Sequence, residues 1–152
     1  MKKNIYYFLV PVLASILGLA DSLYLTIAHY SHTQLVCANN SFINCQSVTS
    51  SVYSFIPKTS VPVSLLGIIW FLISLIILFM AFKEMLKNIK SYYLYWTSFG
   101  LAFVIYLVYT EFFRLHKICE WCTLVHILVA VCFVSALLIV KANNIYSDNS
   151  DK

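Results

Sequence analysis

The stretch that decides the fold is residues 61–82, VPVSLLGIIWFLISLIILFMAF, which contains no charged side chain. As a helix it would be about 33 Å long at about 1.5 Å per residue, enough to cross the roughly 30 Å hydrocarbon core of a bilayer. With three further apolar stretches it predicts four spans, at about 5–28, 61–82, 92–113 and 119–140. Buried helices of a soluble protein are the alternative, but three charge-free runs of at least 19 residues favour membrane spans.

The composition of the whole chain agrees with this interpretation. Of 152 residues, 61% are hydrophobic and 11% are charged, and the mean hydropathy is +0.83. A water-soluble domain carries about 25% charged residues. These values exclude a disordered chain, a nucleic-acid-binding protein and a cytosolic enzyme. We therefore expect an all-α polytopic membrane protein whose residues 1–152 form a single four-helix domain in the lipid bilayer.

The positions of the cations predict the orientation of the spans. With four spans, both termini lie on one side of the membrane, and that side carries seven cations against three. The seven are Lys2, Lys3, Lys83, Lys87, Lys90, Lys141 and Lys152, and the three are Lys58, Arg114 and Lys117. Because the cation-rich side is normally the cytoplasm, we expect cytoplasmic termini and an outer loop at 29–60. We expect this membrane to be the cell inner (cytoplasmic) membrane.

A cleaved signal peptide is a competing interpretation of the first 20 residues or so. Met-Lys-Lys precedes an apolar stretch, and Gly18-Leu19-Ala20 offers small residues before a cut. The apolar stretch is longer than the usual signal core of about 7–15 residues, which favours a span. Loop 29–60 stays outside on either interpretation.

Two shorter segments also carry expectations. Residues 45–56 are predicted to form a short amphipathic helix, because Val48, Val52 and Phe55 recur at helical spacing with serines opposite them. We expect this helix to lie horizontally on the membrane surface. The polar tail after Lys141 is expected to be frayed.

Four of the five cysteines form two pairs. Cys37 and Cys45 are separated by seven residues in the outer loop, and Cys119 and Cys122 form a CxxC at the start of the fourth span. A helix N-terminus favours the reactive thiolate form, and two dithiols within reach of each other can pass two electrons by exchange. Two alternatives stay open: a disulfide that only staples the loop, and a four-cysteine zinc site, for which the seven-residue spacing is poor.

Ionisable side chains inside the spans are further candidates. His126 shares a helix face with Cys119 and Cys122, at positions i, i+3 and i+7. An intramembrane histidine indicates a functional site, although a hydrogen bond between two helices is an equally good interpretation. Asp21 in the first span has the same two interpretations.

The remaining notable residues have structural interpretations. Glu111 and Glu120 fall near the outer boundary, where we expect solvated carboxylates. Cys132 lies deeper in the fourth span and is expected to be a small core residue. Gly18, Gly67 and Gly100, one in each of the first three spans, are expected to allow close packing of helices.

Taken together, these motifs resemble the vitamin K epoxide reductase family. The resemblance rests on the spacing of Cys37 and Cys45, on Ser51 six residues further on, on VPVSLLG at 61–67 and on the CxxC at 119–122. It extends from GLADSLYL at 18–25 to Cys132 and so covers nearly the whole chain. It implies a four-helix bundle around a quinone, capped by the horizontal loop helix.

The resemblance also implies a role for each cysteine of the two pairs. Cys119 and Cys122 correspond to the redox pair next to the quinone, with Cys122 nearer the ring. Cys37 and Cys45 correspond to a shuttle pair that takes electrons from a partner thiol protein. On this correspondence Cys45 exchanges onto Cys119.

The implied quinone is ubiquinone or menaquinone. The positions implied to bind it are Ser51, Val63, Cys122 and His126. Animal members of the family carry asparagine where Val63 falls and tyrosine where His126 falls, positions implicated in holding the quinone carbonyl groups.

The expected function is that of a membrane thiol oxidoreductase. It would reoxidise an extracytoplasmic thioredoxin-fold disulfide donor and pass the electrons to a membrane quinone, in support of disulfide bond formation. We expect that donor to be a separate protein, because the chain ends about ten residues after its last span. The alternatives are a quinone or quinone-epoxide reductase and a non-catalytic metal-binding membrane protein.

Overall fold

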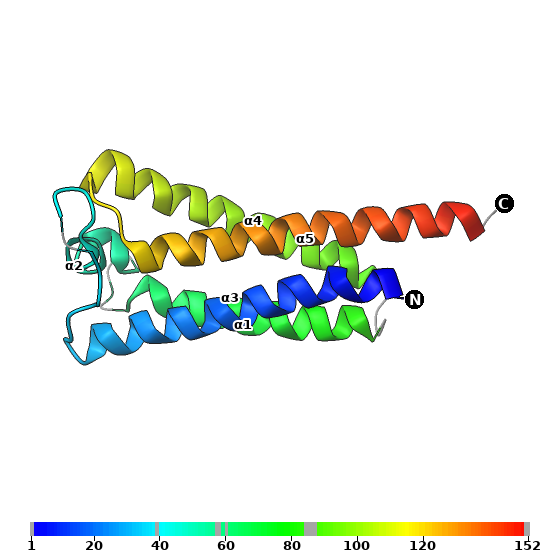
Figure 1. The fold of residues 1–152 in the computed structure, drawn as a ribbon, viewed down its shortest axis with the longest axis horizontal. Helices are drawn as coiled ribbons and strands as arrows, with labels where there is room; N and C mark the ends of the chain where they lie inside the picture. The colour runs from blue at the N-terminus through cyan, green and yellow to red at the C-terminus, as the bar shows by residue number, and fades with distance from the viewer. Residues whose placement is uncertain (1, 39, 57–58, 60, 84–87, 151–152) are drawn as a thin grey trace.

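Four long helices make up most of the computed structural model, which describes residues 2–38, 40–56, 59, 61–83 and 88–150 (Figure 1). They are α1 (Lys2–Tyr30), α3 (Val63–Phe82), α4 (Ile89–Tyr109) and α5 (Glu120–Ser150). The described residues contain no strand beyond isolated bridges. The predicted all-α fold is therefore confirmed.

The structure contains four helical segments that are long and apolar enough to cross a membrane, one at each long helix, and the one at α4 includes the helical turn that follows it. The segments are Tyr7–Tyr30, Val63–Phe82, Ile89–Leu115 and Glu120–Ala142. Their bounds lie within a few residues of the predicted spans, which confirms a multi-pass membrane architecture. Of the cations used to predict orientation, Lys58, Lys87 and Lys152 lie outside the described residues.

The helices run back and forth, so that α1 begins and α5 ends at one end of the bundle (Figure 1). Helix α1 packs against α3 and α5, and α4 packs against α5 and α3. The core contains Phe71 and Cys132, both fully buried, which confirms the expectation for Cys132.

The three glycines sit where helices approach most closely. A Cβ atom on Gly18 would collide with the Phe71 ring, and one on Gly100 with the Trp70 indole. A Cβ atom on Gly67 would lie 2.7 Å from the Ser22 hydroxyl oxygen. The expectation that these glycines allow close packing is confirmed.

The predicted loop helix is shorter than expected. It consists of α2 (Cys45–Thr49) and a separate 3₁₀ turn, η1 (Val52–Ser54). The Ser51 and Ser54 hydroxyls donate to the carbonyl oxygens of Val48 and Thr49, an alternative to helical bonding that ends the helix. Val48 is buried, but Val52 is 80% exposed, so the continuous apolar face predicted through Val52 is wrong. The horizontal placement of α2 on a membrane stays a prediction.

The tail also differs from the expectation. Helix α5 continues past Lys141 to Ser150, so the prediction that this tail frays is wrong. No glycine or proline interrupts residues 141–150. Once a helix exists, each added residue gains a backbone hydrogen bond without a new nucleation cost.

Candidate active site

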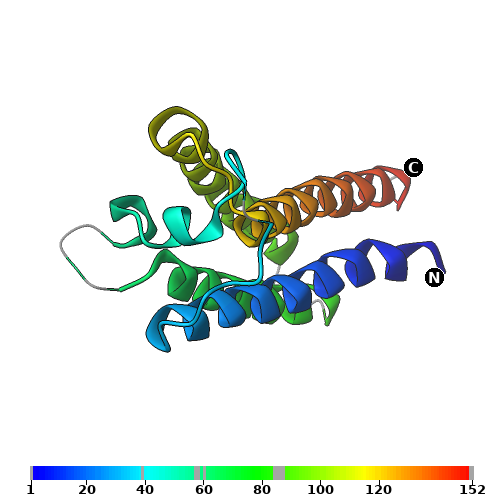
Figure 2. The same ribbon diagram turned by 60° about the vertical axis from the view of Figure 1, so that its left-hand side comes forward.

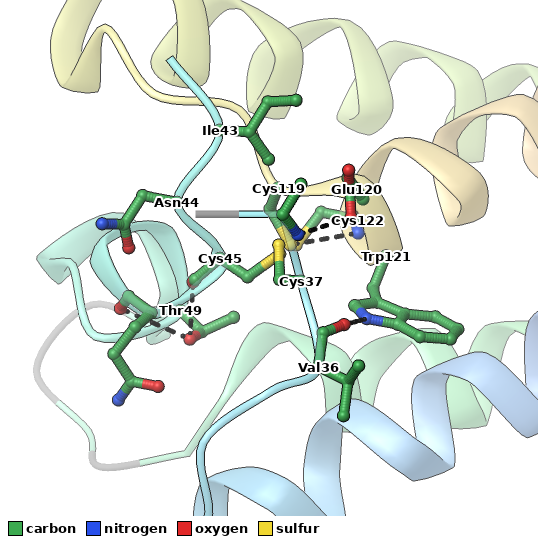
Figure 3. Close-up of a disulfide and its surroundings, with 12 residues drawn as sticks. Val36, Cys37, Ile43, Asn44, Cys45, Thr49, Cys119, Glu120, Trp121 and Cys122 are labelled. Carbon is green, nitrogen blue, oxygen red and sulfur yellow. Dashed lines mark hydrogen bonds between the residues drawn. A yellow bond between two sulfur atoms is a disulfide. The ribbon is translucent and has the colours of Figure 1, made fainter. Parts of the chain in front are cut away.

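The loop that contains α2 lies at one end of the four-helix bundle (Figure 2), and the four paired cysteines pack together there. Cys37 and Cys45 form a disulfide whose Cα atoms lie 6.2 Å apart. Cys45 is 2% exposed and packs in one cluster with Cys119, which is fully buried, while Cys37 and Cys122 pack at the edge of that cluster. The fold thus brings together two cysteine pairs that the sequence places far apart (Figure 3).

The CxxC pair sits at the N-terminus of α5, as the sequence predicts. Cys119 directly precedes the helix, and its Sγ accepts a hydrogen bond from the Cys122 backbone N–H at 3.2 Å. The sulfur takes the place that a serine or aspartate oxygen takes in an N-cap, where the helix dipole favours negative charge. The Cys122 thiol in turn interacts with Cys119, so the two sulfur atoms are neighbours.

The segment that leads to Cys45 is paired with the segment that leads to Cys119. The Asn44 N–H donates to the Ile118 carbonyl oxygen at 3.1 Å, and the Ile118 N–H donates to the Phe42 carbonyl oxygen at 2.9 Å. These bonds form a short parallel bridge between Ile43 and Ile118. Because backbone bonds fix register, they hold Cys45 beside Cys119.

The two residues inside the CxxC hold the chain on either side of Cys37. The Trp121 indole N–H donates to the Val36 carbonyl oxygen at 2.8 Å, and the Ala38 N–H donates to a Glu120 carboxylate oxygen at 3.2 Å (Figure 3). We call the contacts of Ile118, Glu120 and Trp121 with the loop the clamp. Glu120 is exposed, as expected. Its contact and that of Trp121 were not predicted, because the loop conformation is needed to see them.

A cavity of about 400 Å³ lies between the loop and the spans, with Cys122 on its wall. This volume falls within the roughly 300–1,000 Å³ of typical ligand pockets. Aromatic side chains from two helices make most of the wall apolar, among them Trp70, Phe71, Trp96, Phe99 and Phe103. The four positions assigned to quinone binding, Ser51, Val63, Cys122 and His126, all line it.

His126 and Asp21 are both buried inside the bundle. His126 is 8% exposed, lines the cavity and forms no hydrogen bond with another described residue, so the interpretation of it as a bridge between helices is not supported. Both carboxyl oxygens of Asp21 are likewise without a hydrogen-bond partner among the described residues. Asp21 is near enough to Cys122 to interact with it electrostatically but does not line the cavity.

The expectation that Glu111 is a solvated carboxylate is wrong. Its exposed fraction is 5%, and it lines the cavity. Helix α4 does not end at the boundary but continues as a π-helical turn, η2 (Thr110–Leu115), which carries Glu111 inward beside the CxxC pair. Its carboxyl group is near enough to the Cys119 backbone N–H to interact with it.

Among the described residues, the group of side chains placed to bind a metal ion uses the same loop sulfur atoms. The Sγ atoms of Cys37 and Cys45 and a Glu120 carboxylate oxygen lie within 4.8 Å of one another. The two sulfur atoms are bonded to each other, however, and a metal ion binds the thiolate form. In the disulfide state this group does not have the ligands of a zinc site.

Comparison with known proteins gives one match. The sequence model of the vitamin K epoxide reductase family matches residues 9–137, which include all five cysteines and most of each span. A search of curated proteins finds no significant match.

Proposed function

Because this chain belongs to the vitamin K epoxide reductase family, whose members are membrane redox enzymes acting on thiols and quinones, we propose that it is a quinone-dependent thiol-disulfide oxidoreductase. It reoxidises a separate extracytoplasmic protein of the thioredoxin fold and passes the electrons to a membrane quinone. The observation that carries the proposal is the position of Cys122. This residue belongs to the cysteine cluster and also lines the apolar cavity.

The first step is exchange with the partner at the loop pair. Cys37 is the half-buried member of the disulfide, whereas Cys45 is 2% exposed. A partner thiolate therefore attacks Cys37, and the second partner thiol resolves the mixed disulfide. The partner leaves as a disulfide, and Cys37 and Cys45 become thiols. Exchange of this kind conserves the two electrons and transfers them to the loop.

The second step moves the electrons inward. Cys45 lies in the cluster with Cys119, and the bridge between Ile43 and Ile118 supports their approach. The Cys45 thiolate attacks Cys119 of an oxidised CxxC, and Cys122 leaves as a thiolate. Cys37 then closes the loop disulfide again, and the proton that it loses passes to Cys122, which becomes a thiol. Cys119 is fully buried, so the loop pair is needed to relay electrons that a bulky partner could not deliver directly.

The residues of the cavity suit a quinone head group as the substrate that accepts the electrons. A bound quinone, ubiquinone or menaquinone, supplies two-electron, two-proton acceptor chemistry. The His126 imidazole N–H is free to donate to a carbonyl oxygen, and Val63 and Ser51 shape the wall near the loop. The apolar aromatic walls exclude water from the redox centre.

The orientation follows the same proposal. The redox cysteines face the outside of the cell inner membrane, and both termini face the cytoplasm. These two sides differ because the cysteine cluster lies at the opposite end of the bundle from the start of α1 and the end of α5 (Figure 1). The seven-to-three distribution of cations supports this direction. A reporter inserted near Asn40 is expected to be active outside the cell and one fused after Lys152 inside. The opposite result would contradict the direction.

The function is tested with the purified protein in lipid nanodiscs, a reduced thioredoxin-fold protein and a short-chain quinone. We expect the parent protein to form hydroquinone and partner disulfide in equal amounts. Replacement of Cys37, Cys45, Cys119 or Cys122 by serine stops this turnover, and the matched change Cys132→Ser in the core does not. Undiminished turnover without the four cysteines would contradict the proposal.

A further inference from the structure

We propose that Glu111 is the catalytic proton acceptor for the CxxC pair: its carboxylate takes a proton from the pair as the pair is oxidised and returns it toward the quinone oxygen. This inference rests on the proposed function and adds to it a residue to which sequence reasoning gave no role. It starts from the burial of Glu111 beside the reacting cysteines.

Glu111 lines the cavity that Cys122 and His126 also line. Its carboxyl group is near enough to the Cys119 backbone N–H and to the Cys122 thiol to interact with both. The π-helical turn η2 produces this position, and its end is fixed by the backbone N–H groups of His116 and Lys117, which donate to the Glu111 carbonyl oxygen. Single π turns recur at functional sites.

The surrounding charges leave the carboxylate available for a proton. The titratable groups around the CxxC pair and the cavity come from three elements. Helix α5 and its cap contribute Cys119, the exposed Glu120, Cys122 and His126, α1 contributes Asp21 and His29, and η1 contributes Tyr53. Helix α3 contains no titratable side chain, and Arg114 on η2 is exposed. No lysine or arginine lines the described part of the cavity, so no cation there holds Glu111 in a fixed ion pair.

The chemistry requires such a group. When Cys119 and Cys122 form their disulfide, two S–H bonds break, one S–S bond forms, and two electrons and two protons pass to the quinone, which becomes a hydroquinone. A thiol must lose its proton to act as an electron donor. Glu111 accepts the two protons one after the other at its carboxylate, first from Cys122 and then from Cys119, and releases each toward a quinone oxygen. It therefore ends each cycle unprotonated, as it began.

The test uses the pre-reduced protein and follows a single turnover with a short-chain quinone by stopped flow. Glu111→Gln keeps the shape and the carbonyl oxygen that can accept the Cys119 N–H, but it cannot hold the proton. We expect its rate of hydroquinone formation to fall by about 10²-fold, as for other general bases. Thiol titration is expected to find the same number of thiols as in the parent, and exchange with the loop pair should be unchanged.

The pH dependence gives a readout that a structural role would not change. The carboxylate must be unprotonated to act, so the parent rate falls as the pH drops through the titration of Glu111. Glu111→Gln loses that dependence on its own carboxyl group. The matched control is Asp21→Asn, which removes another buried carboxyl group near Cys122 that does not line the cavity. We expect it to stay within a few-fold of the parent.

The outcomes separate this inference from the proposed function. A parent protein that does not reduce quinone contradicts the proposed function itself. An active parent with an equally fast Glu111→Gln variant overturns the role of Glu111 alone. Equal losses in Glu111→Gln and Asp21→Asn also overturn it, because general electrostatics near Cys122 would then explain both.

Discussion

The site has two halves: the cysteine layer, formed by Cys37, Cys45, Cys119 and Cys122, and the cavity. Different forces hold the two halves in place. In the cysteine layer, directional backbone and side-chain hydrogen bonds fix the loop against Ile118, Glu120 and Trp121. In the cavity, apolar contacts between spans set the shape, and His126 has no hydrogen bond with the residues that the structure describes. Thiol exchange needs sulfur atoms in line, whereas an apolar pocket needs shape and a few polar groups. Each half has the kind of contact that its step requires.

The largest effect is expected when electron transfer from the loop cysteines to the cavity is interrupted. We expect Cys45→Ala to abolish electron transfer from the partner, because Cys37 alone cannot pass electrons onward. Cys122 is expected to react with quinone as before once the CxxC pair is reduced chemically. Cys119→Ala should instead leave the loop pair reduced after one exchange with the partner, detectable by mass spectrometry of the alkylated thiols. Full activity after loss of both loop cysteines would favour a disulfide that only staples the loop.

The next largest effect is expected in the cavity, at His126. The variant His126→Phe keeps the bulk and removes the donor. Loss of one donor to an oxygen that gains negative charge costs about 10²-fold or more in turnover in a dry site. We expect that loss in quinone reduction per folded molecule, with unchanged exchange between the cysteine pairs. A rate and a quinone KM both within a few-fold of the parent would make His126 a packing residue.

A third test concerns the packing beneath the cavity. In Gly18→Ala the new methyl group would collide with the Phe71 ring, which is fully buried and lines the cavity. Overpacking of this kind costs about 1–3 kcal/mol in the free energy of unfolding. We expect a lower thermal midpoint and a raised quinone KM. The control Ala20→Val adds bulk at an exposed position of the same helix and should change neither value.

The same contrast explains what the sequence could predict. The spans depend on long apolar runs, a signal that does not need the tertiary structure, and their bounds were predicted to within a few residues. Four of the positions that line the cavity, Ser51, Val63, Cys122 and His126, could be assigned from family motifs. The burial of Glu111 could not, because it depends on a π-helical turn that hydropathy does not reveal. The break after Thr49 depends on which carbonyl each serine hydroxyl bonds.

The smallest effects are expected from one substitution in each half of the site, made to test whether hydrogen bonds in one half affect the other. Trp121→Phe keeps the ring that packs on Tyr24 at 4.9 Å and removes the hydrogen bond to the Val36 carbonyl oxygen. A hydrogen bond contributes about 0.5–1.5 kcal/mol net, and water can replace this one because Val36 is 79% exposed. We therefore expect exchange between the loop pair and the CxxC pair to slow by a few-fold, with little change in thermal stability.

The matched variant is Trp96→Phe, which removes the indole hydrogen bond to the Ser74 hydroxyl at 2.9 Å in the wall of the cavity. This bond lies between spans, far from water, so its loss should lower stability and raise the quinone KM. Exchange between the cysteine pairs, followed by rapid-quench alkylation, should keep the parent rate. If Trp121→Phe exchanges as fast as the parent, the clamp does not position the loop. If both variants slow exchange equally, the two halves of the site do not act independently. Hydrogen bonds in the cavity wall would then also set the alignment of the sulfur atoms.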